Sequence, residues 1–408
     1  LMVWGASAIE KNTKLHRFIY NPVSYALSLT IFTTVWSFYG NIGSAARSGI
    51  FSLSIFVGMV LITLFGFPVI KRLVRLKNEN RSTSIADFIS SRYGKSIAIA
   101  AIITVMIIVG LIPYIGLQLK AVFDNFTLIS GEGKGLIQLS FEIVILSMLA
   151  FSSIYTGLRR VDPTEGHPGL IGIVAASSII KIVGTIVSGM VIIYTVFGSP
   201  GEFLTQISKS ENYELIPAGN SGAASLSRWI SFVILAMLAF LSLPRQFHIA
   251  VVENKNTDHI TSSKWIFLVI TILLHLFILP VAFAGIYSGY PVSEGDNYLL
   301  LIPLRNGQDW LAALVFIGGF AAAISMIMIS LLTISTMLAN HIVQPMAHKF
   351  SLLSSLKGRV REIKIFFIIF FLLSSFLFNK YLSLAYSLTN IGIMSFLAVA
   401  QLAPAYLI

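Results

Sequence analysis

The chain has 408 residues, of which 56% are hydrophobic and only 11% are charged, whereas a typical soluble domain is about 25% charged. This composition excludes a water-soluble fold and indicates that most of the surface faces lipid. Because the chain has no cysteine, it forms neither disulfides nor thiolate metal sites. The formal net charge is +11, but the basic residues do not gather in one polar module, so no nucleic-acid partner is expected.

A membrane-spanning helix needs roughly 20 mostly apolar residues. Residues 1–20 contain the end of a leading helix and a polar loop. The apolar segments that follow are 23–46, 51–74, 96–123, 136–157, 169–197, 228–250, 265–288, 310–345, 365–379 and 382–408. We therefore expect an all-α polytopic membrane protein with about 11 spans. Because the chain starts at Leu1 and stops inside an apolar segment, we also expect it to be a fragment of a longer polypeptide.

The loops between these segments differ in charge. Alternate loops carry 20 of the 28 Lys and Arg residues, whereas the other loops carry seven. Since basic residues concentrate in cytoplasmic loops, the basic set is predicted to be cytoplasmic and the chain to lie in the inner (plasma) membrane. The remaining residue, Lys181, falls inside a segment, where a charge costs roughly 2.5–3.5 kcal/mol and usually has a function.

Apart from the leading helix, the segments form two groups of five, residues 23–197 and 228–408. After five crossings the chain is on the opposite side of the bilayer, so the second group is inverted relative to the first, as in many secondary transporters. The first helix of each group is interrupted, by WSFYGNIG at 36–43 and by LPRQFH at 243–248. Backbone groups freed in lipid must line a cavity or bind something, so the two breaks predict a binding site. Proline kinking or close helix packing is the alternative for either break alone.

Several segments resemble a known family. They are YALSLTIFTTVWSFYGNIGSAARSG (25–49), TSIADFISSRYG (83–94), GLRRVDPTEGHPGL (157–170), LPRQFHIAVVEN (243–254) and FIGGFAAAISMIMISLLTISTMLANHIV (316–343). In these segments the chain resembles the solute:sodium symporter family, most closely the symporter-like membrane domain of CbrA-type sensor histidine kinases. The resemblance implies a single domain with the LeuT-type 5+5 inverted-repeat fold. In the kinase relatives a signalling region that acts on a response regulator would follow.

The resemblance also implies a sodium site between the first and eighth core helices. It places Thr30 and Thr33 at the positions that contribute backbone carbonyls, and Ala322 and Ser325 at the positions of the eighth helix. Oxygen ligands suit an alkali cation. However, Met326 stands where the family has a second hydroxyl, and a thioether is a poor sodium ligand. The sequence therefore leaves sodium binding open.

Two further charged residues admit more than one function. The Lys181 ammonium could contact a substrate carboxylate or take the place of sodium; alternatively, it could pair within the bundle or extend toward the interface. By the resemblance, Glu165 matches an acid on the inner ion path. Its alternative is a stabilising carboxylate at a helix N-terminus.

The predicted substrate site combines side chains from both breaks. Arg245, Gln246 and His248 interrupt the sixth core helix. Because arginine can hold a carboxylate through two parallel hydrogen bonds, a small solute such as an amino acid fits these groups. For Arg245 the alternative is a marker of the cytoplasmic face. Trp36 and Tyr39 are predicted to cover the solute, or else to pack at the first break.

No catalytic site is predicted, because the chain lacks a phosphate-binding GxxxxGK[ST] loop, a GxSxG elbow and an HExxH pair. Any kinase activity would belong to a region after residue 408. Two functions remain open. A transporter moves solute by opening its loaded site to either side, whereas a sensor needs a ligand that prefers one conformation. The expected partners are a small solute, for which the resemblance favours histidine, and the lipid bilayer.

Overall fold

A computed structural model describes residues 5, 9, 16, 19–131, 135–158, 166–209, 222–254, 256–382 and 388–407, and within these ranges every regular element is helical. The elements of the first half, with η marking 3-10 or π segments, are α3 (Pro22–Leu29), η1 (Thr30–Phe32), η2 (Trp36–Gly40), α4 (Asn41–Ser48), η3 (Gly49–Leu53), α5 (Ser54–Phe65), α6 (Phe67–Asn80), α7 (Ile85–Arg92), α8 (Ile97–Ser130), α9 (Leu136–Gly157) and α10 (Pro168–Phe197).

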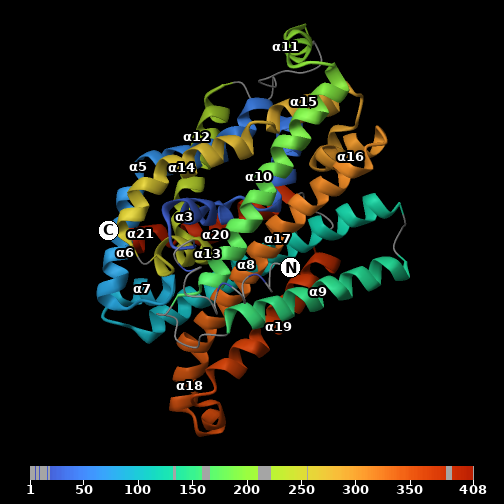
Figure 1. The fold of residues 1–408 in the computed structure, drawn as a ribbon. Coiled ribbons are helices and arrows are strands. Elements are labelled where there is room, and N and C mark those ends of the chain that lie inside the picture. The colour runs from blue at the N-terminus through green and yellow to red at the C-terminus, as the bar shows by residue number, and fades with distance from the viewer. Residues whose placement is uncertain are drawn as a thin grey trace.

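The elements of the second half are α11 (Pro200–Lys209), α12 (Ala223–Ser242), α13 (Pro244–Phe247), η5 (His248–Val252), α14 (Thr257–His275), α15 (Ile278–Tyr287), η6 (Val292–Asn297), α16 (Tyr298–Arg305), α17 (Asp309–Leu338), η7 (Ala339–Val343), α18 (Gln344–Lys349), η8 (Ser351–Leu356), α19 (Val360–Tyr381), α20 (Leu388–Ala400) and α21 (Ala403–Leu407). The long helices α10 and α17 run through the middle of the bundle (Figure 1).

The two halves repeat one order of elements. In the first half a broken helix (α3 with η1, then η2 with α4) is followed by α5 and α6, the short helix α7, and the long helices α8, α9 and α10. In the second half the broken helix is α12 followed by α13 and η5. Next come α14 and α15, then η6 and α16 in the place of α7, and then α17, α19 and α20 with α21. This order is the predicted pair of five-helix units.

The second break lies where the sequence predicts it. Leu243 has an extended backbone (ψ 122°) and separates α12 from α13, whose first residue is Pro244. Proline suits this position because its missing N–H would have no partner in the first turn.

The first break lies earlier than predicted. It falls at Thr33, whose backbone is extended (φ −79°, ψ 97°), while the predicted residues from Trp36 to Gly40 form a π-helical segment that continues into α4. The β-branched residues that surround Thr33 lower helix propensity. Gly43, which the sequence indicates as part of the break, instead lies inside α4 and allows close packing, because a Cβ there would lie 1.8 Å from Asp296 Oδ1.

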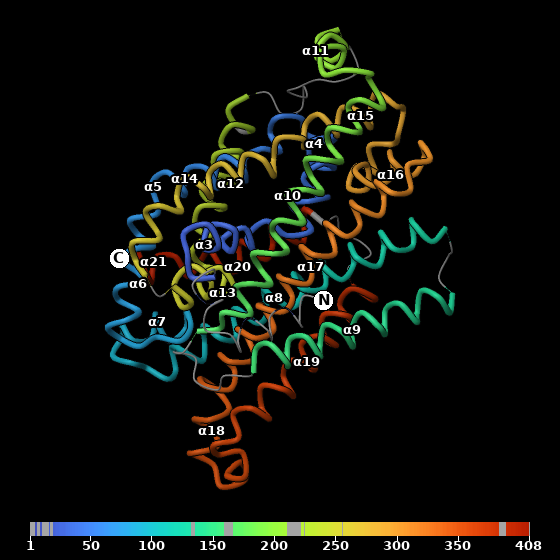
Figure 2. Tube along the Cα trace, viewed as in Figure 1, coloured from blue at the N-terminus to red at the C-terminus, as the bar shows by residue number. Residues whose placement is uncertain are grey.

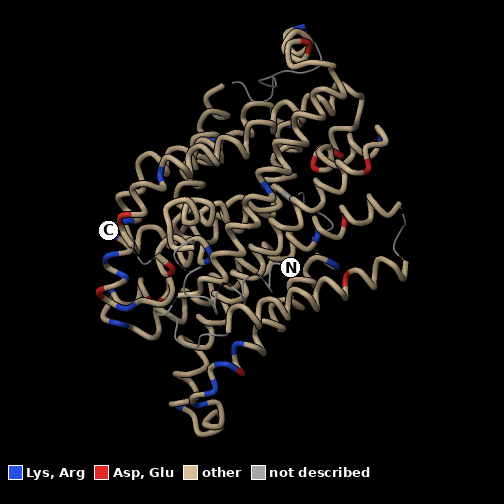
Figure 3. Tube along the Cα trace, in the orientation of Figure 1, with Lys and Arg blue, Asp and Glu red and all other residues tan. Residues whose placement is uncertain are grey.

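Within the described residues seven helices are long and apolar enough to cross a membrane, which makes the chain a multi-pass membrane protein. Shorter apolar helices, such as Pro22–Phe32 and Thr389–Ala400, account for other predicted spans. Basic residues gather at the end of the bundle where α6, α7 and α18 lie, opposite α11 (Figure 3). In the interior, α3 contacts η5 and η1 contacts α13, so the two broken helices lie side by side there (Figure 2).

Candidate functional site

The backbone freed at the first break is satisfied by side chains from other helices. Gln118, in the middle of α8, accepts a hydrogen bond from Val35 N at 3.1 Å. Gln246, from the second break, donates to Leu29 O at 3.2 Å. The two breaks therefore meet at one place, and polar side chains replace the hydrogen bonds that the helices have lost there.

Lys181 supplies the most direct of these contacts. From α10 its Nζ donates to Thr30 O at 2.9 Å and to Thr33 O at 3.0 Å, and it lies 3.4 Å from Thr30 Oγ1. The side chain is only 1% exposed. No ion pair to Lys181 occurs among the described residues, so the ammonium is held by carbonyl and hydroxyl oxygens alone. These two carbonyls are the ones that the family resemblance assigns to sodium.

The eighth core helix, α17, contributes the other predicted ion ligands. The Ser325 hydroxyl donates within its own helix, to Ala321 O at 3.0 Å and to Ala322 O at 3.3 Å. Met326 is fully buried, and its sulfur lies 3.7 Å from the Ser330 hydroxyl. The hydroxyl of Ser325 is thus engaged by its helix, and the thioether adds no hard oxygen ligand.

Arg245 places a second buried cation at the break of the sixth helix. Its side chain is 0% exposed, and its guanidinium lies over the ring of Tyr114, 4.6 Å from the centroid. None of its three nitrogens has a hydrogen-bond partner in the described part of the chain. A buried guanidinium without acceptors is costly, so the arrangement favours an anionic group from outside the chain.

An open pocket of about 300 Å³ lies on the predicted outer side of the first break. Its walls include Trp36, Asn41, Arg47, Arg228, Trp229 and Thr389. Arg47 forms an ion pair with Asp296 at 3.0 Å, at the edge of the bundle. The volume and the mixture of aromatic and polar side chains suit a small polar solute.

A chain of aromatic contacts separates this pocket from Arg245. Trp36, which lines the pocket, contacts Phe396 with ring centroids 5.0 Å apart. Phe396 in turn lies 6.0 Å from the ring of Tyr114, on which Arg245 stacks. Phe32 also packs against Phe396, at 5.3 Å. The rings of Trp36, Phe396 and Tyr114 thus form a continuous series of contacts from the outer pocket to the Arg245 guanidinium.

The other predicted site residues lie in different surroundings. Tyr39 is directed at α17, where its hydroxyl donates to Val315 O at 3.0 Å beside Gly319. His248 does not face the outer pocket; its Nε2 lies 3.1 Å from Glu253 Oε1 on the other side of the break. Glu165 lies outside the described residues. The binding roles assigned to these residues stay predictions.

Sequence reasoning assigned no role to Gln118, Tyr114 or the pair His167 and Glu253. Gln118 is 0% exposed in the middle of an apolar helix. A polar residue at such a position in the sequence could have indicated that a backbone group on a neighbouring helix needs a hydrogen-bond partner. Glu253 lies in the VVEN segment that carries the resemblance, and His167 lies in GHPGL. Only the fold brings these two distant segments together.

A substrate-bound, outward-open structure of a Na⁺-coupled sialic acid symporter matches this chain with a TM-score of 0.70. The match has 14% sequence identity and covers 98% of this chain and 84% of that one. No protein-family model and no curated protein matches the chain. At this identity the comparison shows the fold alone: the chain has a LeuT-type inverted-repeat helical fold.

Proposed function

We propose that this chain is a transporter-type membrane domain that binds a small carboxylate-bearing solute between its two broken helices. In this proposal Lys181 supplies the positive charge that a sodium ion would otherwise bring to the first break. The observation that carries the proposal is the pair of hydrogen bonds from the Lys181 ammonium to Thr30 O and Thr33 O.

Electrostatics argue against sodium and ammonium sharing these carbonyls. Two unit positive charges about 4 Å apart repel by roughly 4 kcal/mol at the effective dielectric constant of a protein. Each carbonyl already accepts a charge-assisted hydrogen bond of ordinary length. Met326 further lowers the number of oxygen ligands on the side of α17. We therefore expect solute binding that does not require sodium.

The carboxylate is inferred from Arg245. Its unpaired guanidinium and the nearby Lys181 ammonium leave two buried positive charges near the breaks, with no ion-pair partner for either among the described side chains. An anionic solute group would offset this charge and could accept parallel hydrogen bonds from the guanidinium. An amino acid fits this requirement; histidine as the ligand stays a prediction from the sequence resemblance.

Transport is supported by the shared fold with a Na⁺-coupled symporter. The outer pocket and the aromatic rings behind it also correspond to the access path and gate that alternating access requires. Output to a histidine kinase and a response regulator is the second candidate function, and it rests on the sequence resemblance. Both functions share the solute-binding step.

The test uses the full-length protein in proteoliposomes with radiolabelled L-histidine and a mixture of labelled amino acids. We expect saturable uptake that is equal in sodium and in potassium media and that Arg245→Gln abolishes. Arg305→Gln is the matched control, because Arg305 pairs with Glu294 at the outer surface, away from the breaks. Uptake that requires a sodium gradient would overturn the assignment of Lys181. Binding without uptake would overturn transport in favour of sensing.

A further inference from the structure

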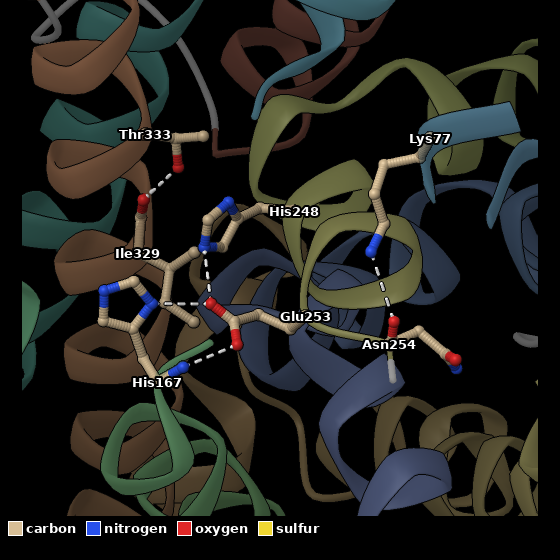
Figure 4. Close-up of polar contacts among 7 residues, drawn as sticks. All are labelled: Lys77, His167, His248, Glu253, Asn254, Ile329 and Thr333. Carbon is tan, nitrogen blue, oxygen red and sulfur yellow. Dashed lines mark hydrogen bonds and ion pairs between the residues drawn. The ribbon is translucent and has the colours of Figure 1, made fainter. Parts of the chain in front are cut away.

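A second polar cluster lies on the side of the sixth-helix break opposite the outer pocket. His167 precedes α10, His248 begins η5, and Glu253 directly follows η5. The three side chains point at one another, as Figure 4 shows, and all are nearly completely buried. His167 Nδ1 lies 2.7 Å and His248 Nε2 3.1 Å from the same oxygen, Glu253 Oε1. Neither the proposed solute site nor the lysine site uses these groups.

The geometry of the cluster fits a metal ion after a modest movement of the side chains. One ligand atom from each residue lies within 4.8 Å of the others. Around a tetrahedral Zn²⁺, with ligand distances of 2.0–2.2 Å, neighbouring ligand atoms would lie about 3.3 Å apart. The observed contacts of 2.7 and 3.1 Å would lengthen by about 0.6 and 0.2 Å, and the two histidine nitrogens, which lie within 4.8 Å of each other, would approach by up to about 1.5 Å as the metal replaces the hydrogen bonds.

The surroundings supply two further features of a metal site. The second oxygen, Glu253 Oε2, accepts a hydrogen bond from the backbone N–H of His167 at 2.8 Å, which orients the carboxylate as outer partners of metal ligands do. The ring of His248 is 6% exposed, and its Nδ1 has no hydrogen-bond partner in the ranges that the structure describes. Hydrogen bonding within the protein thus does not by itself account for burying this imidazole.

An adjacent cavity of about 10 Å³ provides room for a fourth ligand, since this is close to the space that one water molecule needs. His167, His248, Thr336 and Lys364 are among the residues that line it. The ammonium of Lys364 would stabilise an anionic fourth ligand such as hydroxide. The Thr333 hydroxyl is already bonded to Ile329 O, so it is directed away from the ligand set (Figure 4).

We propose that His167, His248 and Glu253 form a binding site for a transition-metal ion of the Zn²⁺ class. Two imidazole nitrogens and one carboxylate oxygen suit such a borderline ion better than Mg²⁺ or Ca²⁺, which prefer oxygen ligands alone. The bound ion connects the start of α10 to the end of the sixth helix, on the predicted cytoplasmic side of the solute site. The proposal does not depend on the proposed function.

The test uses the purified full-length protein without any polyhistidine tag, stripped with a chelator and then titrated with Co²⁺. We expect one Co²⁺ per chain, with the visible d–d absorption of a tetrahedral or five-coordinate site, displaced by stoichiometric Zn²⁺. Zn²⁺ should also raise the midpoint of thermal unfolding. His167→Gln and His248→Gln should each weaken Co²⁺ binding at least tenfold. His341→Gln is the matched control, because His341 contacts the Ser84 hydroxyl and is not part of the cluster, so this change should leave binding unchanged.

Two results would overturn the proposal. One is the absence of saturable Co²⁺ or Zn²⁺ binding by the wild-type chain, which would show the cluster to be a hydrogen-bonded triad only. The other is unchanged binding by both His167→Gln and His248→Gln. Glutamine can still donate to Glu253, so these variants are expected to fold, and their thermal unfolding in the presence of chelator checks this. The wild-type titration remains decisive if either variant unfolds.

Discussion

Replacing Lys181 with alanine should convert the first break into a sodium-responsive site. The change removes the donors to Thr30 O and Thr33 O. Each buried carbonyl left without a donor costs about 1–3 kcal/mol, so in a sodium-free potassium buffer this term favours unfolding by about 2–6 kcal/mol. Removal of a buried charge acts in the opposite direction and lowers the net cost. The sodium response is therefore a more informative readout than the absolute stability.

The expected response follows from mass action. At a sodium concentration 100 times the dissociation constant, binding to the freed carbonyls would stabilise the variant by about 2.7 kcal/mol. For a chain of this size we expect the unfolding midpoint to rise by roughly 3–8 °C. The assay is thermal unfolding in detergent, with sodium exchanged for potassium at constant ionic strength.

The wild-type chain should show no such difference between the two cations. Lys264→Ala is the matched control, because Lys264 also donates to a backbone carbonyl, Leu64 O at 2.9 Å, but away from the breaks. Stabilisation of the wild type by sodium over potassium would refute the reasoning, as would a Lys181→Ala variant that ignores sodium.

The remaining predictions concern solute binding and packing. Arg245→Gln should weaken binding of a carboxylate solute at least about 30-fold, because a buried charge pair that loses one partner costs 2 kcal/mol or more; equal affinity in a binding titration would contradict this. Gly43→Ala should lower the unfolding midpoint, since the new methyl group overlaps Asp296 and η6 must shift, at a cost of about 1–3 kcal/mol; an unchanged midpoint would show that this contact is not tight. Gln118→Leu should destabilise by about 1–3 kcal/mol because Val35 N loses its acceptor, and chemical or thermal unfolding measures the difference.

The overall fold could be predicted because it depends on features that a sequence displays directly. Apolar segment lengths give the spans, and an odd number of spans per unit requires inversion of the second unit. The second break could be located because Pro244 cannot continue a helix from the preceding turn. In the structure, Leu243, directly before that proline, has an extended backbone and ends α12.

The first break could not be located as accurately, because Gly43, which the sequence analysis includes in the break, is a glycine for a different reason. Gly43 lacks a side chain because η6 packs against α4, and this contact joins residues about 250 positions apart in the chain. The true break is marked only by a short β-branched run around Thr33, a weak signal in a membrane helix.

The contacts of the buried charged residues also could not be predicted from the sequence. For Lys181 the sequence left four alternatives, which differ by the rotation of α10 about its axis and by the place where the first helix opens. The structure directs Lys181 to the freed carbonyls. In the same way, His167 and Glu253 are 86 residues apart in the chain, and only the fold, which places the start of α10 near the end of η5, brings them into contact.

Equilibrium binding of radioactive sodium to the purified protein tests the central claim most directly. Because the Lys181 ammonium already holds the two carbonyls of the first break, we predict no saturable sodium binding to the wild-type chain, with or without solute. Lys181→Ala should gain one saturable site per chain. Stoichiometric, saturable sodium binding by the wild-type chain would contradict the account.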